Sequence, residues 1–497
     1  MKGVCIKIYK NNNLKPENKS SIRYTVLNIT STGYRYSIDS INSNHFPSLY
    51  IHMERLSCSV QNYAWGKLGK SSTVSQLAEA NGDETTNSEA RYAEYWFGTH
   101  HAGPSSVRSS SSIPSSDDIS LAAWLSQNTA ALGSMPNRPD CIIKDNFCGL
   151  PYLAKVLSIA KCLSIQAHPD KKLAEKLHAE RPDVYKDPNH KPEMAIALTP
   201  FEAMCGFRKV TEILGFINSV PELKLVIELG DASIGITQGG GGAGGGAAAI
   251  ASLESAVTSN DPLEISSALQ NIFRIYANAS PTLVTEQVNL FVNRIGPISM
   301  NTFDDTANDP SGVTLAEGLA VRLATQFPGD IGVFAPFLLN FMRLQPGDAI
   351  FLAANEPHAY ISGDCFEVMA NSNNVVRMGC TPKLRDVPVL TEMLTFSHGL
   401  PTVLRGEPAG DHVRIYKPTD PAVTEFQVER IEVKANEKCI LTLPSTPSIV
   451  IVVQGNGTLN DIEASRGHVF IQHAGTELKV EGTGDDGAQV FRVQCRE

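Results

Sequence analysis

The sequence predicts a mainly β fold built from jelly rolls, with an α-helical unit inserted into it. Short alternating runs such as EFQVERIEV and SIVIVVQGNGTLN, separated by Gly and Asn turns, fill the last hundred residues. Similar short strands precede residue 208 and return after Asp330. Between them, apolar residues recur at three- and four-residue spacing, which is typical of amphipathic helices. The five stretches with this spacing are KVTEILGFINSV, IASLESAVT, LEISSALQNIFRIYANA, LVTEQVNLFVNRIG and TLAEGLAVRLATQFPGD.

These patterns divide the chain into four parts. Residues 53–207 and 331–400 are expected to form one β-rich catalytic domain, and residues 401–497 a C-terminal jelly roll. Residues 208–330 are expected to form the helical insertion. The first 52 residues remain as an extension.

That extension differs from the rest of the chain. It is rich in Asn and Ser, carries a net charge of +5, and lacks the apolar core of a signal peptide. We expect either a disordered extension or an upstream stretch wrongly joined to the coding region, with Met53 as the natural start. A mitochondrial presequence is the alternative, although the segment lacks the usual Arg-rich pattern.

Two glycine-rich stretches are predicted to form a loop and a turn. The tract GGGGAGGGAAA at 239–249 predicts a flexible loop. It is not a phosphate-binding loop, because no GK[ST] follows it. In the C-terminal part, Gly-Asn-Gly at 455–457 predicts a hairpin turn.

Composition excludes several classes of protein. Of the 497 residues, 42% are hydrophobic and 19% charged, which is too apolar for a disordered chain. A net charge of -10 without a Lys or Arg run argues against nucleic acid and anionic membranes as partners. No apolar stretch reaches the roughly 18 residues needed to span a bilayer.

The cysteines point to a reducing compartment. All ten are scattered, and none forms a CxxC pair. We therefore expect reduced thiols and a cytoplasmic location. Any metal must then be held by His, Glu, Asp or amide side chains.

The first motif with chemical content is Gln166-x-His168. It ends the β-rich run LPYLAKVLSIAKCLSI and precedes the predicted helix KKLAEKLHAE. On a strand, residues two apart share a face, so both side chains can reach one atom. The pair is weak evidence for a metal when taken alone.

The second motif is Lys191-x-Glu193, which leads into the apolar strand MAIAL. A charged pair entering an apolar strand is costly unless it is paired or ligated. A salt bridge at the rim of the strand is the alternative interpretation.

The third motif is Pro357-His358-Ala359-Tyr360, followed by Glu367 and Arg377. A His that closes a Gly-Asp turn, strand and Pro unit resembles the metal-binding hairpin of the cupins. With the first two motifs it gives one amide, two imidazoles and one carboxylate. This set, with a single negative charge, suits a catalytic zinc that stays strongly Lewis acidic.

Seven stretches together resemble the type I phosphomannose isomerases. Their order is kept from Met53 to about Val389. The stretches are VQNYAWG (60–66), AEYWFGTHHAGPS (93–105), LSIQAHPDK (163–171), YKDPNHKPEMAIAL (185–198), FEAMCGFR (201–208), EPHAYISGD (356–364) and NSNNVVRMGCTPKLRDV (371–387).

The resemblance implies one zinc ion per chain and a set of site residues. It also implies a cupin-type catalytic domain, a helical insertion and a C-terminal jelly roll. The reaction implied is interconversion of mannose 6-phosphate and fructose 6-phosphate, which contributes to the supply of GDP-mannose and to the catabolism of mannose. The implied zinc ligands are Gln166, His168, Glu193 and His358, and the implied catalytic arginine is Arg377.

Such a reaction moves a proton between carbons 1 and 2 and places negative charge on an enediolate oxygen. Arg377 can stabilise that charge. We expect Glu367 to be the base, with Lys191 and Tyr360 assisting proton transfer or ring opening.

The substrate phosphate needs fixed donors. For this role we expect Ser164, Lys155 and Lys383, because each lies in a matching motif beside the metal ligands. A solvated surface lysine is the alternative for the two lysines. His100 and His101 are expected to pack or hydrogen-bond within a loop.

Other functions remain open at this stage. A metal-retaining binding or storage protein would lack Arg377 or Lys191, and both are present. A different cupin enzyme, such as a dioxygenase, would gather more His ligands. An isomerase fused to a sugar-nucleotide pyrophosphorylase would need a nucleotidyltransferase domain, for which the chain has no room. We expect a monomer whose partner is one small phosphorylated sugar.

Overall fold

The structure is a computed structural model that falls into two compact units, residues 1–53 and 54–497. In the first unit, β1 (Ile6–Tyr9) pairs antiparallel with β2 (Thr25–Asn28). The rest of the predicted 1–52 extension lies outside the described residues, so its interpretation stays a prediction. The described residues are 6–9, 25–28, 53–109, 117–135, 143–144, 147–230, 245–296 and 314–496.

A ten-stranded antiparallel sheet carries the predicted site residues. Its main order is β16-β15-β18-β12-β7-β4, and β13, β14, β17 and β19 join it through β18 and its neighbours. Strand β18 is the centre of the sheet, since it pairs with β12, β13, β14 and β15. The strands are β4 (Ser59–Gln61), β7 (Glu94–Phe97), β12 (Tyr152–Ile159), β13 (Ile165–Ala167), β14 (Glu193–Ala197), β15 (Phe201–Phe207), β16 (Leu339–Leu344), β17 (Ala349–Leu352), β18 (His358–Ala370) and β19 (Val376–Gly379).

An eleven-stranded sheet follows the order β20-β21-β22-β27-β24-β26-β3-β8-β9, with β23 on β27 and β25 on β24. Eight of its strands come from the C-terminal part and three from near the start of the second unit. The strands are β3 (Met53–Ser57), β8 (Ser106–Val107), β9 (Ile119–Ser120), β20 (Glu407–Pro408), β21 (Val413–Tyr416), β22 (Gln427–Val433), β23 (Lys438–Leu441), β24 (Ser448–Leu459), β25 (Ile462–Ser465), β26 (Val469–Gln472) and β27 (Leu478–Gln494).

The two sheets share one hydrophobic core. Phe366 of β18 stacks on Phe491 of β27 with ring centroids 4.7 Å apart, and both side chains are buried in the same cluster. The predicted boundary at residue 400 therefore does not separate two independent cores. In addition, β3, β8 and β9 lie within the predicted range 53–207 but belong to the sheet of the C-terminal part.

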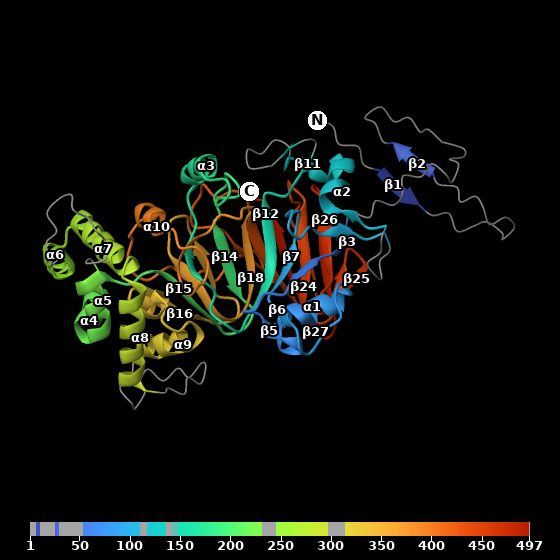
Figure 1. Cartoon of the computed structure of the whole chain (residues 1–497). Helices are drawn as coiled ribbons and strands as arrows, with labels where there is room; N and C mark the ends of the chain where they lie inside the picture. The colour runs from blue at the N-terminus through green and yellow to red at the C-terminus, as the bar shows by residue number, and fades with distance from the viewer. Residues whose placement is uncertain are drawn as a thin grey trace. The chain divides into compact units, whose positions relative to one another are not determined.

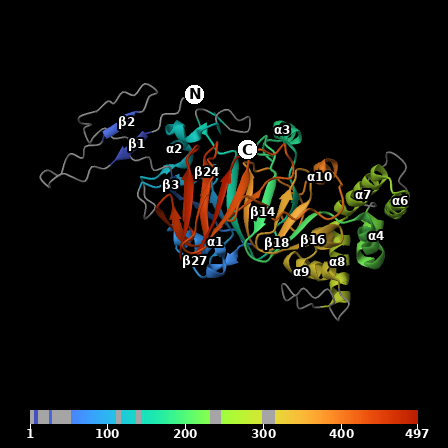
Figure 2. The same cartoon turned by 180° about the vertical axis from the view of Figure 1, so that it is seen from behind.

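In the described part of the chain, six α-helices lie between the strands β15 and β16, and they gather on the side of the first sheet away from the C-terminal strands (Figures 1 and 2). The predicted fold class, mainly β with an inserted helical unit, is confirmed. Sequence analysis did not identify the second of these helices. They are α4 (Val210–Ser219), α5 (Pro221–Gly230), α6 (Gly245–Ser259), α7 (Pro262–Ala277), α8 (Pro281–Ile295) and α9 (Leu315–Gln326).

The glycine-rich tract is partly helical, which differs from the predicted loop. Helix α6 begins at Gly245, while residues 239–244 lie outside the described part of the chain. Gly246 packs so closely on α5 that a Cβ there would lie 2.2 Å from the carbonyl oxygen of Ile227. The glycine thus permits close helix packing, and the alanines after it favour helix.

The predicted Gly-Asn-Gly hairpin also differs from the structure. Gly455 to Gly457 lie within β24, where the pairing with β27 shifts register. The turn comes later, at Asn460 and Asp461, which both have positive φ and connect β24 to β25. Two positive-φ residues are typical of a type I′ hairpin, and Asn and Asp tolerate that conformation.

Shorter elements complete the described chain, and none of its helices is long and apolar enough to cross a membrane. These elements are β5 (Lys67–Leu68), η2 (Gly69–Ser71), α1 (Thr73–Asn81), β6 (Arg91–Tyr92), α2 (Leu121–Gln127), η3 (Thr129–Leu132), β10 (Ile143–Lys144), β11 (Phe147–Cys148), α3 (Lys171–Glu180), η6 (Ile331–Phe337) and α10 (Val387–Met393).

Candidate active site and metal centre

A cavity of about 500 Å³ opens beside β12, β13, β18 and β19. It brings together nine of the eleven residues predicted for the site, and the other two, His168 and His358, are buried next to it. The nine are Lys155, Ser164, Gln166, Lys191, Glu193, Tyr360, Glu367, Arg377 and Lys383.

Three predicted metal ligands converge at the inner end of this cavity. The Nε2 atoms of His168 and His358 lie 3.4 and 3.5 Å from the same carboxylate oxygen of Glu193. All three side chains are buried, and their ligand atoms lie within 4.8 Å of one another. They are the only such group of His, Cys, Asp and Glu found among the described residues.

The orientation of the two imidazoles fits a metal ion. The Nδ1 atom of His168 lies 2.7 Å from the carbonyl oxygen of Asn374, and that of His358 lies 3.1 Å from the carbonyl oxygen of Glu356. Because a carbonyl only accepts, each Nδ1 carries the proton and each Nε2 presents a lone pair. Both Nε2 atoms are buried without a hydrogen-bond partner. Lone pairs that face a carboxylate need a cation between them.

Charge in this group also favours metal binding. Burial lowers the pKa of His168 to about 4, so its imidazole is neutral. Although burial opposes it, the neighbouring Lys191 ammonium holds the pKa of Glu193 well below its usual range. Neutral imidazoles and an ionised carboxylate are the forms that bind zinc.

Gln166 reaches the same place from β13. It pairs with His358 on one side and with Arg377 on the other, so strand pairing places all three together. Its Oε1 accepts a hydrogen bond of 3.1 Å from the hydroxyl of Ser164. Strand pairing therefore places Gln166 beside His358 and Arg377, and its role as a metal ligand stays a prediction.

The carbonyl group of Asn374, which accepts the hydrogen bond from His168, lies in a segment that Asp187 positions. Asp187 accepts hydrogen bonds from the Ser372 hydroxyl at 2.8 Å and from the Asn373 N–H at 2.7 Å. The Asn374 side-chain amide donates to the carbonyl oxygen of Asp187 at 2.6 Å. Asp187 thus fixes the segment that directs His168 towards Glu193.

A second buried group of charges lies beside the metal ligands. Lys155 pairs with Glu367 in the register of β12 and β18, and its Nζ lies 3.0 Å from Glu367 Oε2. The same Nζ lies 3.4 Å from Glu94 Oε2 on β7. Tyr360 donates a 2.8 Å hydrogen bond to Glu367 Oε1.

Burial and these contacts set the ionisation of Glu367 and Tyr360. Burial raises its pKa, while Lys155 acts in the opposite direction. The pKa of Tyr360 is raised well above its usual value by burial and by Glu367, so the phenol stays protonated as a donor. A carboxyl with a raised pKa in a cavity is a suitable general base.

The predicted phosphate ligands differ in their surroundings. Ser164 and Lys383 line the cavity, and Lys383 is exposed. Lys155 instead is buried between two carboxylates, which raise its pKa although burial alone would lower it. A phosphate could reach this ammonium only in competition with both ion pairs.

Sequence analysis missed Glu94 and Trp96 as members of the site. The Trp96 indole N–H donates to Glu94 at 2.5 Å, and Lys155 lies over the Trp96 ring at 5.3 Å. The signal was present, because Glu94 is a carboxylate in the otherwise apolar strand EYWF. Nearby, His100 and His101 stack with ring centroids 4.5 Å apart, and neither belongs to the metal group.

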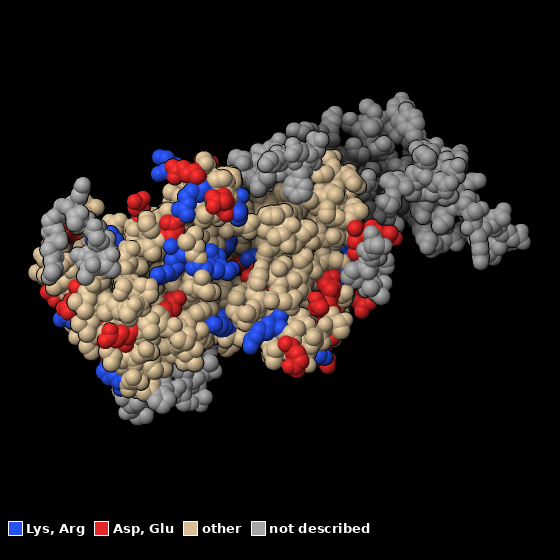
Figure 3. All heavy atoms as spheres, in the orientation of Figure 1, with Lys and Arg blue, Asp and Glu red and all other residues tan. Residues whose placement is uncertain are grey.

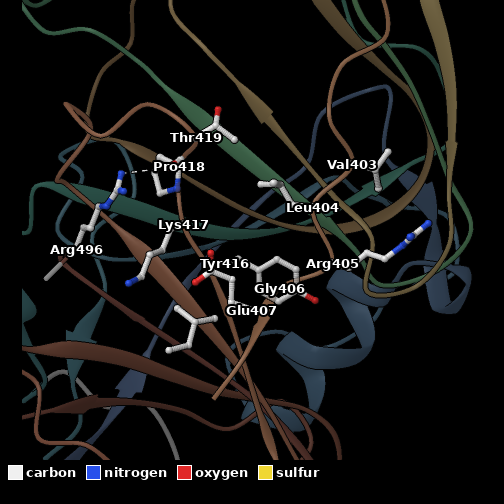
Figure 4. Close-up of a pocket in the computed structure, with 11 residues that line it drawn as sticks. Val403, Leu404, Arg405, Gly406, Glu407, Tyr416, Lys417, Pro418, Thr419 and Arg496 are labelled. Atoms are coloured by element: carbon white, nitrogen blue, oxygen red, sulfur yellow. Dashed lines mark hydrogen bonds between the residues drawn. The ribbon is translucent and has the colours of Figure 1, made fainter. Parts of the chain in front are cut away.

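A second hollow, of about 470 Å³, lies between segments 403–407 and 415–419 (Figure 4). It contains none of the predicted site residues. Arg496 there donates to the carbonyl oxygen of Pro418, and Arg405 pairs with Asp348. Its two arginines are thus engaged locally, and the absence of the predicted site residues favours the first cavity as the site.

Comparisons with known proteins agree with this geometry. Three family models match the chain: the catalytic domain of type I phosphomannose isomerase at residues 53–210, its helical insertion domain at 246–339 and its C-terminal domain at 419–460. The chain is similar to the mannose-6-phosphate isomerase of Bos taurus, with 40% identity over 88% of this chain and 98% of the relative. Mannose-6-phosphate isomerase 2 of Arabidopsis thaliana is 38% identical over 87% of this chain and 91% of its own length.

Solved structures give the same result. A crystal structure of the mannose 6-phosphate isomerase of Salmonella typhimurium, bound to fructose 6-phosphate and zinc, matches with a TM-score of 0.68 and 25% identity. The match covers 90% of this chain and all of that one.

Proposed function

The chain belongs to the type I phosphomannose isomerase family, and from this premise we propose that its cavity interconverts mannose 6-phosphate and fructose 6-phosphate with the residues described above. The observation that carries the proposal is the convergence of two imidazole lone pairs on the buried carboxylate of Glu193, next to Glu367 in one cavity.

Zinc is the metal cofactor of this site. We assign its binding to Gln166, His168, Glu193 and His358. When bound, the ion supplies a Lewis acid that polarises substrate oxygens. Lys191, whose Nζ lies 3.0 Å from the second oxygen of Glu193, holds that carboxylate in its ionised form.

Glu367 is the proposed base that moves the proton between carbons 1 and 2. Its two oxygens are held by Tyr360 and Lys155, so its orientation is fixed before substrate arrives. Tyr360 can return a proton to a substrate oxygen, because its hydroxyl is protonated and adjacent. Arg377 is charged and lines the same cavity, where it stabilises the enediolate.

The phosphate is proposed to bind at the outer part of the cavity, near Ser164 and Lys383. Lys383 is exposed and free to meet an incoming anion. For Lys155, which was also predicted as a phosphate ligand, the contacts with Glu367 and Glu94 support a role in positioning the base instead.

A coupled assay with mannose 6-phosphate tests the function. We expect turnover in the purified protein, at least a tenfold loss after treatment with a chelator, and recovery with one equivalent of zinc. His358→Asn should remove the bound zinc, whereas the matched control His101→Asn should retain it. Full turnover in a zinc-free sample would contradict the proposal.

Two further predictions accompany this function. We propose a cytoplasmic protein, which is supported by seven free cysteines among the described residues. We also propose a monomer, without nucleic acid or membrane as partner. Sedimentation of the purified chain across a range of concentrations tests the oligomeric state, and a concentration-dependent shift would contradict it.

A further inference from the structure

We propose that Lys161 binds the substrate phosphate, and that the end of helix α9 in the helical insertion holds Lys161 in position. This inference rests on the proposed function, because it concerns the same cavity. It gives the insertion a direct part in substrate binding.

The cations of the cavity fall into two groups. Lys155 and Lys191 are buried, and each lies within 3.4 Å of a carboxylate oxygen. Lys161, Arg377 and Lys383 also line the cavity. In the described part of the chain, no carboxylate lies within 4.0 Å of these last three cations.

The difference matters for a phosphate. A cation that is already paired must give up its partner to bind an anion, whereas an unpaired cation offers its full charge. A phosphate monoester carries about -1.5 to -2 charges at neutral pH and has three acceptor oxygens. It therefore favours the unpaired cations, and since Arg377 is assigned to the enediolate, Lys161 and Lys383 are left for the phosphate. Lys and Arg side chains also gather at the middle of the face shown in Figure 3, between the helical insertion and the sheets.

Lys161 is held at the cavity by contacts on both sides of its backbone. Its own N–H donates to the carbonyl oxygen of Trp65 at 3.2 Å. The next N–H, that of Cys162, donates to the side-chain carbonyl of Gln326 at 2.9 Å. Gln326 is the last residue of α9, so the insertion fixes the segment that presents Lys161.

The side chain of Lys161 is positioned by the following residue of the insertion. Its Nζ lies 4.2 Å from the ring centroid of Phe327, the C-cap residue of α9. A cation–π contact orients an ammonium without neutralising it. Because an ammonium has three N–H donors, those turned away from the ring remain available. Phe327 also lines the cavity, so the ring places these donors at its wall.

Lys161→Met tests the assignment, because Met keeps the length and apolar contact of the stem but removes the charge. We expect the KM for mannose 6-phosphate to rise at least tenfold, which corresponds to about 1.4 kcal/mol, while kcat changes less than threefold. The inhibition constant of inorganic phosphate should rise by a similar factor. The matched control is Lys176→Met, an exposed lysine on α3 outside the cavity, which should change neither constant.

A second variant tests the role of the insertion. Phe327→Leu keeps an apolar wall but removes the ring, so the KM should rise by a smaller factor. In the double variant with Lys161→Met, the two effects should be less than multiplicative, because both act on one ammonium.

The outcomes separate this inference from the proposed function. An active wild type with unchanged KM and phosphate inhibition in Lys161→Met overturns the inference alone. A raised KM with unchanged phosphate inhibition and a lowered thermal midpoint also overturns it, since that combination indicates a structural role. A zinc-loaded wild type without turnover defeats the proposed function itself.

Discussion

The buried lysine Lys155 offers the sharpest test of how the site is organised. Its Nζ lies 3.0 Å from Glu367 and 3.4 Å from Glu94, and the exposed fractions of the three side chains are 8%, 4% and 11%. In Lys155→Met, the aliphatic packing is kept and the charge is lost. Two buried carboxylates then lie close together without a cation.

The magnitude follows from this burial. Removal of one partner from a buried ion pair costs about 3–5 kcal/mol, because the other charge is left uncompensated. For the unit of residues 54–497, an unfolding entropy of about 2.1 cal/mol/K per residue makes this a decrease in Tm of roughly 3–5 °C. Differential scanning fluorimetry of zinc-saturated protein measures it. Lys176→Met is the control, and its Tm should not change.

A double variant isolates the charge effect. Adding Glu94→Gln to Lys155→Met removes one of the two uncompensated carboxylates, so we expect part of the lost stability to return. Loss of Lys155 should also raise the pKa of Glu367 and move the acid limb of the kcat profile to higher pH. An unchanged Tm together with a tenfold higher KM would refute this reasoning and favour the phosphate role that the sequence suggested.

Three further predictions concern the base, the metal and pH. Glu367→Gln should lower kcat by about 10²- to 10⁴-fold with unchanged zinc content, measured by coupled assay and metal analysis; near-normal turnover would exclude it as the base. Asp187→Ala should weaken zinc binding by about 10- to 100-fold in a chelator competition, because it frees the loop that directs His168; an unchanged affinity would show that the loop holds its shape without Asp187. Burial lowers the pKa of His100 to about 4, so the unfolded chain, with an ordinary pKa of about 6.5, takes up a proton first as the pH falls. The Tm should therefore decline between pH 6.5 and 4, and less steeply in His100→Asn; parallel declines would contradict this.

The helical insertion shows what periodicity can predict. Of its six described α-helices, five follow clear three- and four-residue spacing, and the sequence predicted those five. Helix α5 has apolar residues on several faces, since Leu225 and Leu229 are 37% and 52% exposed, so its period is blurred. The helix begins at Pro221. A proline usually indicates the end of a helical pattern, although it is favoured in the first turn of a helix.

The site shows a similar division between local and long-range information. Gln166 lies on β13 and His168 directly follows that strand, so local spacing alone was enough to propose both as neighbouring ligands. The role of Lys155 depends on Glu94 and Glu367, which reach it only through the pairing of β7, β12 and β18. Lys161 likewise depends on Phe327, from a helix far along the chain. The spacing of residues along the sequence predicts neither of these two sets of contacts.

Total charge is a poor guide to what this cavity binds. The chain carries -10 overall, and -15 without its first 52 residues, which argues against large polyanions as partners. At the inner end of the cavity, the carboxylates of Glu94, Glu193 and Glu367 outnumber two ammonium groups by one. A zinc dication reverses that balance. The cavity adds three further cations that have no carboxylate partner among the described residues. A small phosphorylated sugar is therefore attracted by the local arrangement of charge even though the protein as a whole is acidic.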